Sequence, residues 1–466
     1  MARDTVQEDS GLKRFGQALA DWCEKWFPDA YIFAVLAVLI VFLIGWAMGN
    51  NPGQMTIMFG NGFWGLIPFT MQMAFIVIGG YALASSPPVY RAVQWLSTIP
   101  QTPRGAIAFV AFFSMFSSLL SWGFSLIFSG LLVRELCRRL KGIDFRAIGA
   151  AAYLGLGAVW ALGLSSSAAL LMNTKGSIPA DLYKISGLIT LDKTIFTWQS
   201  ITTCAIIMAV SVIIAYYSAP NPEKAKTAEH YGVNLEPIEF KLGVKEKPAE
   251  WLEYSPLLTV LISAIGLVYV YHMVNTKGWL NVLDLNTYNF LFLILAMLLH
   301  WRPRSFLKAI SASVPATAGV LLQFPFYGGI FGLIMGTGIS HALAQLFVQI
   351  STPGSYPVLV GIYSAVLGLF VPSGGSKWII EAPYVLEAAK NLGVNLGWIV
   401  QIYNAAEALP NLINPFWMLP LLGVLNMRAR EMVGYSVLQL IFHIPIVLFL
   451  CWFFARTMPY VAPVFQ

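Results

Sequence analysis

One stretch of the sequence restricts the fold more than any other: residues 309 to 376 contain no Asp, Glu, Lys or Arg. A helix that crosses a membrane needs about 20 consecutive apolar residues, so this stretch is long enough for two or three crossings. Charged residues make up only 11% of the whole chain, whereas soluble domains contain about a quarter. The sequence therefore predicts an all-α polytopic membrane protein.

Three other classes of protein are disfavoured. The net charge of +6 does not indicate nucleic-acid binding, because the basic residues lie at the ends of predicted spans. The sequence contains no GxSxG motif and no His near its serine-rich turns, which argues against an intramembrane hydrolase or acyltransferase. Neither a disulfide framework nor a zinc site is expected, because the cysteines lie far apart without a CxxC pattern: Cys23, Cys137, Cys204 and Cys451. No cofactor is expected.

Apolar and hydrophilic runs divide the chain into five segments. Residues 1–28 have apolar side chains three and four positions apart, which predicts an amphipathic helix on the cytoplasmic membrane surface. The others are a first transmembrane repeat (29–218), a cytoplasmic linker (219–254), a linking transmembrane helix (255–280) and a second transmembrane repeat (281–466). Within the first repeat, residues 50–62 are rich in Gly and Asn and are expected to form a loop.

A shift of 251 residues superimposes the two halves of the chain. It recovers the same kinds of element in the same order: a span, a long tract broken by Gly and Pro, a short span, a Ser/Gly turn and an interrupted helix. It also aligns Gln72 with Gln323, Phe75 with Phe326, Gln94 with Gln345, Gly123 with Gly374, Ser125 with Ser376, and Gly142-Ile-Asp144 with Gly393-Val-Asn395.

The basic residues indicate that the second half is inverted. Clusters at 134–146, 302–308 and 428–430 mark cytoplasmic ends by the positive-inside rule. The first Ser/Gly turn, at 117–125, then opens to the cytoplasm and the second, at 373–377, to the outside. Two halves of opposite orientation, with short helices and helices broken by Gly and Pro in matching places, are typical of secondary transporters, with the site near the midplane. A channel would not need two such repeats.

Four polar segments are expected to meet at that site: residues 117–125, 165–173, 373–377 and 404–414. Irregular backbone at membrane depth is tolerated only where it is buried in protein or lines a cavity. Freed amides at helix N-termini and nearby hydroxyls are expected to hold a substrate carboxylate. An alternative is that the small residues only allow close helix packing. The predicted substrate-binding residues are Ser121, Gly123, Ser125, Ser165, Ser166, Ser373, Gly374, Gly375, Ser376, Lys377, Asn411 and Asn414.

Three charged residues and two asparagines are candidates for charge balance and ion coupling. Lys377, Glu381 and Glu407 each cost about 2.5 to 3.5 kcal/mol at membrane depth, which makes them functional candidates. Lys377 either pairs with Glu381 one helical turn away or meets the substrate anion, leaving a glutamate to take up a proton. Asn173 and Asn414, with carbonyls of unwound backbone, are candidates for holding a cation; the only metal considered is Na+, without an assigned ligand set.

The segment from Pro372 to Pro383, with residues 117–125 and Asn411-Leu-Ile-Asn-Pro415, resembles the bacterial short-chain fatty acid transporter family of the AtoE type. The similarity extends over essentially the whole chain, and the family is similar in turn to a wider ion-transporter superfamily. The members of that superfamily share two inverted repeats, each with a re-entrant hairpin and a discontinuous transmembrane helix, so the resemblance implies the same fold here. The resemblance implies a multi-pass protein of the bacterial inner membrane that imports acetoacetate or butyrate with H+ or Na+ by an elevator-like movement. A Ser-Asn-Thr triplet, typical of the dicarboxylate branch, is absent.

The sequence thus predicts a secondary active symporter for short-chain fatty acid anions and not an enzyme. The alternatives are an exporter of amphipathic carboxylates or antimetabolites and, less favoured, a C4-carboxylate carrier. The expected partners are a short monocarboxylate and the lipid bilayer, with no nucleic acid; a homodimer and a monomer both stay open.

Overall fold

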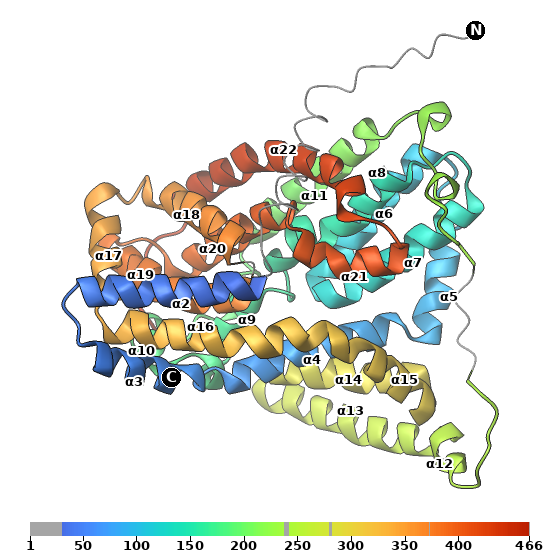
Figure 1. The fold of residues 1–466 in the computed structure, drawn as a ribbon, viewed down its shortest axis with the longest axis horizontal. Coiled ribbons are helices and arrows are strands. Elements are labelled where there is room, and N and C mark those ends of the chain that lie inside the picture. Colours follow the sequence, from blue (N-terminus) through green and yellow to red (C-terminus); the bar gives the residue numbers. More distant parts are fainter. Residues whose placement is uncertain (1–29, 237–241, 279–281, 372, 466) are drawn as a thin grey trace.

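The computed structural model describes residues 30–236, 242–278, 282–371 and 373–465 (Figure 1). The predicted amphipathic helix of residues 1–28 lies outside these ranges. The described part is helical, with one isolated bridge between Gly187 and Val464 and no strand. Seven of its helices are long and apolar enough to cross a membrane, and four shorter helices are also apolar. The predicted all-α, multi-pass fold is therefore confirmed.

The helices of the first half run from Ala30 to Ser218. They are α2 (Ala30–Ala47), α3 (Pro52–Phe63), α4 (Ile67–Ala84), α5 (Pro87–Leu96), α6 (Pro103–Leu120), α7 (Trp122–Arg139), α8 (Phe145–Leu154), α9 (Ser167–Asn173), α10 (Ala180–Ser186) and α11 (Trp198–Ser218).

The linker and the second half contain the remaining helices. They are α12 (Glu250–Tyr254), α13 (Leu257–Lys277), α14 (Leu285–His300), α15 (Pro303–Ser313), α16 (Ala318–Gly336), α17 (Ile339–Ile350), α18 (Tyr356–Phe370), α19 (Gly374–Leu392), α20 (Leu396–Asn411), α21 (Pro415–Leu425) and α22 (Ala429–Ala455).

The helix boundaries repeat at the predicted offset. Adding 251 to the first residue numbers of α3, α4 and α8 gives the first residue numbers of α15, α16 and α20. The junction before α8 is also repeated: Gly142 has φ +77° and its counterpart Gly393 has φ +67°, a conformation that favours glycine. Asp144 then caps α8, and Asn395 caps α20. The two halves share local structure as well as element order.

The counterpart helices α4 and α16 run in opposite directions. Met58, in the α3 helix that leads into α4, packs against Gly336 near the end of α16. Further along, the ring of Phe69 stacks on Phe324 near the start of α16, with 5.7 Å between the centroids. Because residue numbers rise along one partner as they fall along the other, this pair supports the predicted inversion of the repeats.

The expectation of a loop at residues 50–62 is wrong, because residues 52–63 form α3. The Asn51 side chain accepts hydrogen bonds from the backbone of Gly53 and Gln54, and Pro52 occupies the first turn, where it favours helix initiation. A Cβ atom at Gly62 would lie 2.5 Å from the carbonyl oxygen of Gly328. The glycines that suggested a loop instead allow two helices to pack at short range.

The three basic clusters gather at one end of the helices, which we call the basic end (Figure 1). A nitrogen of Arg134 on α7 donates to the carbonyl oxygen of Val424 on α21, at 3.2 Å. On α15, Arg304 forms a 3.0 Å ion pair with Glu253 of α12. This arrangement is the one that the positive-inside rule predicts when all three clusters face one compartment.

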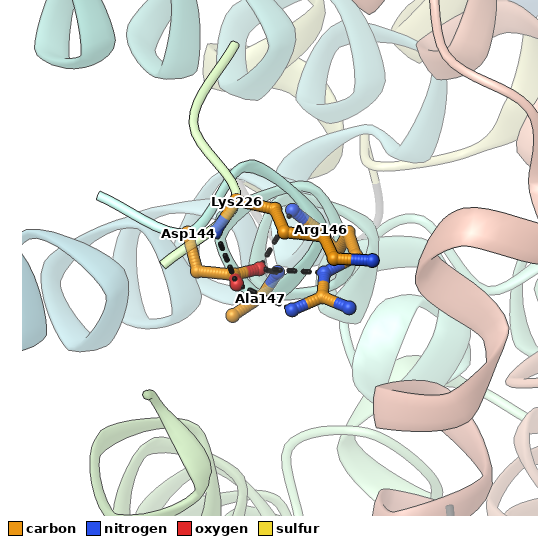
Figure 2. A network of polar contacts seen from close by, with 4 residues as sticks. All are labelled: Asp144, Arg146, Ala147 and Lys226. Carbon is orange, nitrogen blue, oxygen red and sulfur yellow. Dashed lines mark hydrogen bonds and ion pairs between the residues drawn. The ribbon is translucent and has the colours of Figure 1, made fainter. Parts of the chain in front are cut away.

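A buried polar network ties the linker to the start of α8 (Figure 2). The carboxylate of Asp144 accepts hydrogen bonds from the backbone N–H groups of Arg146, Ala147 and Lys226, each at 3.1 Å. The Arg146 side chain forms an ion pair with the same carboxylate at 2.6 Å. The backbone N–H of Phe145 donates in turn to the Lys226 carbonyl at 2.8 Å. One side chain thus caps the helix, pairs a buried cation and holds the linker.

Replacing Asp144 by Ala is expected to destabilise the protein by about 3 kcal/mol, because it leaves the buried Arg146 cation without its anion. Asp144→Asn retains a capping oxygen and should cost less than Asp144→Ala. Thermal unfolding of the purified variants in detergent measures both effects. Equal melting temperatures for Asp144→Ala and the wild type would exclude this role.

Candidate functional site

Both predicted Ser/Gly turns lie between antiparallel helices. Helices α6 and α7 meet at Ser121, whose hydroxyl accepts a hydrogen bond from the backbone of Phe124. Helix α18 ends at Phe370, and α19 begins at Gly374 after Ser373, which is extended like Ser121. Each turn releases the backbone amides of a helix N-terminus. We call these turns hairpin tip 1 and hairpin tip 2.

Both predicted discontinuous helices are interrupted. The first passes from α8 through a π-helical turn (Gly155–Val159) and a 3-10 turn (Trp160–Leu162) before α9 resumes. The second breaks between Asn411 and Pro415, where α20 ends and α21 begins. The two are in contact, since the Tyr153 hydroxyl of α8 donates to the carbonyl of Asn411 at 2.6 Å. The π-helical turn makes the first interruption the longer one.

Hydrogen bonds join both hairpin tips to the broken helices. At tip 1, the backbone N–H of Trp122 donates to the hydroxyl of Ser165 at 2.7 Å. Next to Ser165, the hydroxyl of Ser166 donates to the side-chain oxygen of Asn404 on α20 at 3.0 Å. On the same helix, the Tyr403 hydroxyl donates to the carbonyl of Gly374 at tip 2, at 2.6 Å. The structure therefore brings the four predicted polar segments together.

The glycines of tip 2 are required by close packing. A Cβ atom at Gly374 would lie 2.1 Å from a ring carbon of Trp160, and one at Gly375 would lie 2.6 Å from a ring carbon of Phe69. Both positions are buried against aromatic side chains from the first half. The packing interpretation of these glycines is thus supported, although it leaves their backbone amides available as donors.

We expect Gly374→Ala to cost about 1 to 3 kcal/mol through overpacking and to lower uptake, because tip 2 must move away from Trp160. Gly123, the counterpart of Gly374 in tip 1, provides a matched control. A Cβ atom there would meet its nearest atom at 3.6 Å, an ordinary contact, so Gly123→Ala should be tolerated. Melting temperature and substrate uptake measure the difference, and equal behaviour of the two variants would contradict it.

Lys377 lies in a fully buried charge cluster with Glu381 and Glu407, all three side chains being 0% exposed. Its ammonium forms an ion pair with Glu407 and lies 3.9 Å from the carboxylate of Glu381. It also donates to the carbonyl of Ser364 at 2.6 Å and lies 4.6 Å from the ring centre of Tyr403. The predicted neighbour Glu381 is thus the more distant of two partners.

The charges in this cluster do not balance unless a proton is added. One ammonium faces two carboxyl groups, and Ser364 donates its hydroxyl to Glu381. The second oxygen of Glu381 and both oxygens of Glu407 have no hydrogen-bond partner among the described residues, and one of the Glu407 oxygens faces the Lys377 ammonium as an ion pair. Burying a net charge away from water is costly, whereas one bound proton makes the cluster neutral. This arrangement is suited to taking up and releasing a single proton.

Several side chains that were predicted to bind the substrate or an ion form hydrogen bonds with other residues of the chain. Ser125 donates to the carbonyl of Ser114 within its own hairpin at 2.7 Å, and Asn173 donates to the carbonyl of Leu283 at 3.2 Å. The hydroxyls of Ser373 and Ser376 bond to each other. Asn411 is buried with a side-chain oxygen that has no partner in the described part of the chain, and Asn414 is half-buried at the start of α21.

A cavity of about 1100 Å³ leads from the basic end toward tip 1. It lies between α4, α7, α15, α16 and α21. Along α7 its lining extends from Arg134 to Trp122, a distance of about 18 Å at 1.5 Å per residue. Trp122 makes an edge-to-face contact with Trp417 at 5.5 Å, and Gln323 lines the same cavity. The cavity is open at the basic end, and the opening of the first hairpin to the cytoplasm stays a prediction.

Four residues that line the cavity or surround Lys377 are not among the site residues that the sequence predicts: Gln323, Ser364, Tyr403 and Arg134. Gln323 was marked only by its alignment with Gln72 in the repeat. Ser364 and Tyr403, which surround Lys377, lie in apolar segments and carry no distinguishing pattern. Arg134 was assigned only to a basic cluster.

A family model and two related proteins carry the same family description. The family model described as "Short chain fatty acid transporter" matches residues 11–454. A protein of Escherichia coli (strain K12), provisionally named a short-chain fatty acid transporter, is 34% identical over 434 residues, which cover 92% of this chain and 97% of that protein. A Haemophilus influenzae protein with the same name is 32% identical over 441 residues, with coverages of 93% and 98%.

Two solved structures share the fold. The YdaH transporter of Alcanivorax borkumensis, described as having an unusual topology, matches with a TM-score of 0.61 at 14% identity. The match covers 92% of this chain and 98% of the YdaH chain. MtrF of Neisseria gonorrhoeae matches with a TM-score of 0.56 at 13% identity, with coverages of 96% and 98%. At these identities the likeness concerns the fold alone. Since the family model and both relatives span nearly the whole chain, this protein is a membrane transporter, not an enzyme, and belongs to the short-chain fatty acid transporter family.

Proposed function

We propose that the chain is a secondary active transporter that imports short-chain fatty acid anions, such as acetoacetate and butyrate, by cation symport across the bacterial inner membrane. The observation that carries the proposal is the hydrogen-bonded meeting of both hairpin tips with both broken helices. In transporters built from inverted repeats, substrate and coupling-ion sites lie at such a meeting point. The hairpins would re-enter the membrane and move with their substrate in an elevator-like step.

The substrate carboxylate is assigned to the region between Ser166 and tip 2. There α19 begins with Gly374 and Gly375, whose amides form a helix N-terminus with partial positive charge. Ser373 and Ser376 place two hydroxyls beside the same turn. Lys377 is assigned to charge balance and not to the substrate, because Glu407 already pairs with its ammonium.

Coupling is assigned to a proton bound by the Lys377, Glu381 and Glu407 cluster. The ammonium of Lys377 already lies between the two carboxyl groups, in the position that a sodium ion would need. A proton requires no further space and corrects the charge balance. This favours H+ over Na+ as the coupling ion.

Uptake of labelled butyrate and acetoacetate into proteoliposomes tests the function. An inward proton gradient is expected to drive accumulation, and a sodium gradient alone is not. Protein-free vesicles are the necessary control, because neutral butyric acid crosses bilayers unaided. Accumulation driven only by sodium would refute proton coupling, and no accumulation above the control under either gradient would refute import of these acids.

The cavity supports a second candidate function, the export of larger amphipathic carboxylates. Its volume of about 1100 Å³ exceeds the range of about 300 to 1,000 Å³ typical of small-molecule pockets, and it opens at the predicted cytoplasmic end. MtrF of Neisseria gonorrhoeae, which shares the fold, is described as illuminating a class of antimetabolite efflux pumps. Efflux of a labelled aromatic carboxylate from preloaded vesicles, without butyrate uptake, would favour this function.

A further inference from the structure

We propose that the cavity at the basic end is a capture site for monocarboxylates with an apolar tail, in which Arg134 and Lys308 attract the carboxylate and the apolar walls hold the tail. We call this cavity the basic vestibule. The inference rests on the proposed transport of such acids, and it adds a site that is separate from the meeting point of the hairpin tips.

The charged residues that line the basic vestibule are all of one sign. Arg134 and Lys308 line the basic vestibule, and none of the described lining residues is acidic. Three other basic residues at the same end are paired with carboxylates at 2.5 to 3.0 Å: Arg138 with Glu135, Arg146 with Asp144, and Arg304 with Glu253. Arg139 instead donates to the carbonyl oxygen of Pro100. The positive-inside rule explains why basic residues are found at this end. It does not explain why, among the described residues, no carboxylate pairs with either cation that lines the cavity.

Among the described residues, the side chain of Arg134 is held by carbonyl oxygens and not by a carboxylate. Its guanidinium donates to the carbonyl oxygens of Val424, Asn234 and Glu236 at 3.0 to 3.2 Å. Carbonyl groups fix the geometry of the side chain but carry no net charge, so its positive charge remains available to an anion. A cleft of one sign with low-dielectric walls concentrates the field and raises the local concentration of counter-ions.

The walls fit an apolar tail. Ala309, Ala312 and Leu322 line one side, and Ile127 and Leu131 of α7 line the other. The inner end is closed by Trp122 and Trp417, whose rings touch.

A monocarboxylate can therefore leave its charge at the rim and bury its tail. A second carboxylate on the tail would face this apolar wall and lose its hydration without a partner. The basic vestibule thus favours monocarboxylates over dicarboxylates. Its volume does not restrict tail length closely.

The charge is tested with Arg134→Gln, Lys308→Gln and the double variant. Each single change is expected to raise the KM for butyrate about threefold to tenfold with kcat nearly unchanged, because it removes attraction at the rim. Raising the salt concentration should increase the wild-type KM but change that of the double variant little. Lys141→Gln is the matched control: Lys141 is exposed at the same end and does not line the cavity.

The apolar wall is tested by filling it. A Cβ atom at Gly423, which lines the basic vestibule, would meet no atom within 4 Å, so Gly423→Leu fills the cavity without a backbone clash. It should lower the uptake of hexanoate at least fivefold more than that of acetate. Gly434 on α22 also has open space and does not line the cavity, so Gly434→Leu should preserve the wild-type ratio.

Binding is tested separately from transport with Ala312→Cys, at an exposed position of the wall. Butyrate should slow its modification by an anionic methanethiosulfonate reagent, and succinate should not; the parent chain gives the background from native cysteines. Unchanged KM values in the charge variants would overturn the proposed role of the basic vestibule. So would modification of Ala312→Cys that butyrate does not slow, if the wild type transports butyrate. Protection by butyrate with no transport of any short-chain acid would support the vestibule and refute the proposed function.

Discussion

Lys377→Met is expected to abolish substrate uptake and to destabilise the protein by about 3 to 5 kcal/mol. Its ammonium is the only cation in contact with Glu381 and Glu407 among the described residues, and all three groups are fully buried. Removing one partner of a buried pair leaves an uncompensated charge, which is far more costly than replacing both. Uptake of labelled butyrate and thermal unfolding in detergent measure the two effects, with membrane insertion checked first.

A double variant separates stability from transport. Lys377→Met combined with Glu407→Gln removes the charge at both ends of the closer pair, so it should recover most of the lost melting temperature while uptake stays absent. Normal uptake by a correctly inserted single variant would show that the ammonium has no part in transport. Recovery of both properties in the double variant would show that the cluster is only structural.

Glu407→Gln is expected to abolish proton-driven accumulation, a loss of at least tenfold, while exchange of butyrate across the membrane continues. The amide cannot bind and release a proton, but it keeps the size of the side chain beside Lys377. Accumulation under an imposed pH gradient, compared with counterflow at equal pH on both sides, separates coupling from substrate movement.

Glu381→Gln is the matched variant, because Glu381 lies farther from the ammonium and already accepts the Ser364 hydroxyl. A smaller defect in Glu381→Gln would assign the proton to Glu407. The reverse order would assign it to Glu381, and an unchanged response to the pH gradient in both variants would exclude the cluster as the coupling site.

Much of the fold could be predicted because the signals that recur in the two halves are short-range sequence patterns. Gly142 and Asp144 recur as Gly393 and Asn395, and both pairs have the same roles: a positive φ angle followed by a helix cap. The hairpin tips and the helix breaks were also visible, since Ser and Gly interrupt long apolar runs. These features depend on residues that are near one another in the sequence.

The features that were missed depend on long-range packing. Residues 50–62 form a helix because Gly62 lies against Gly328 of the second half. Lys377 has Glu407 as its closer partner because α19 and α20 pack together, although Glu381 is only four positions away. The basic vestibule joins Arg134 and Lys308, which no local pattern connects.

The unequal interruptions of the two broken helices have a consequence for kinetics. If both halves were identical, exchanging their conformations would give two access states of equal energy. The π-helical turn at Gly155–Val159 occurs before the first break, whereas the second break spans only the residues between Asn411 and Pro415. The empty carrier should therefore rest preferentially on one side of the membrane. Gradients still set the direction of net flux. The resting bias instead makes the half-saturating concentration of the transported acid differ between the two sides of the membrane.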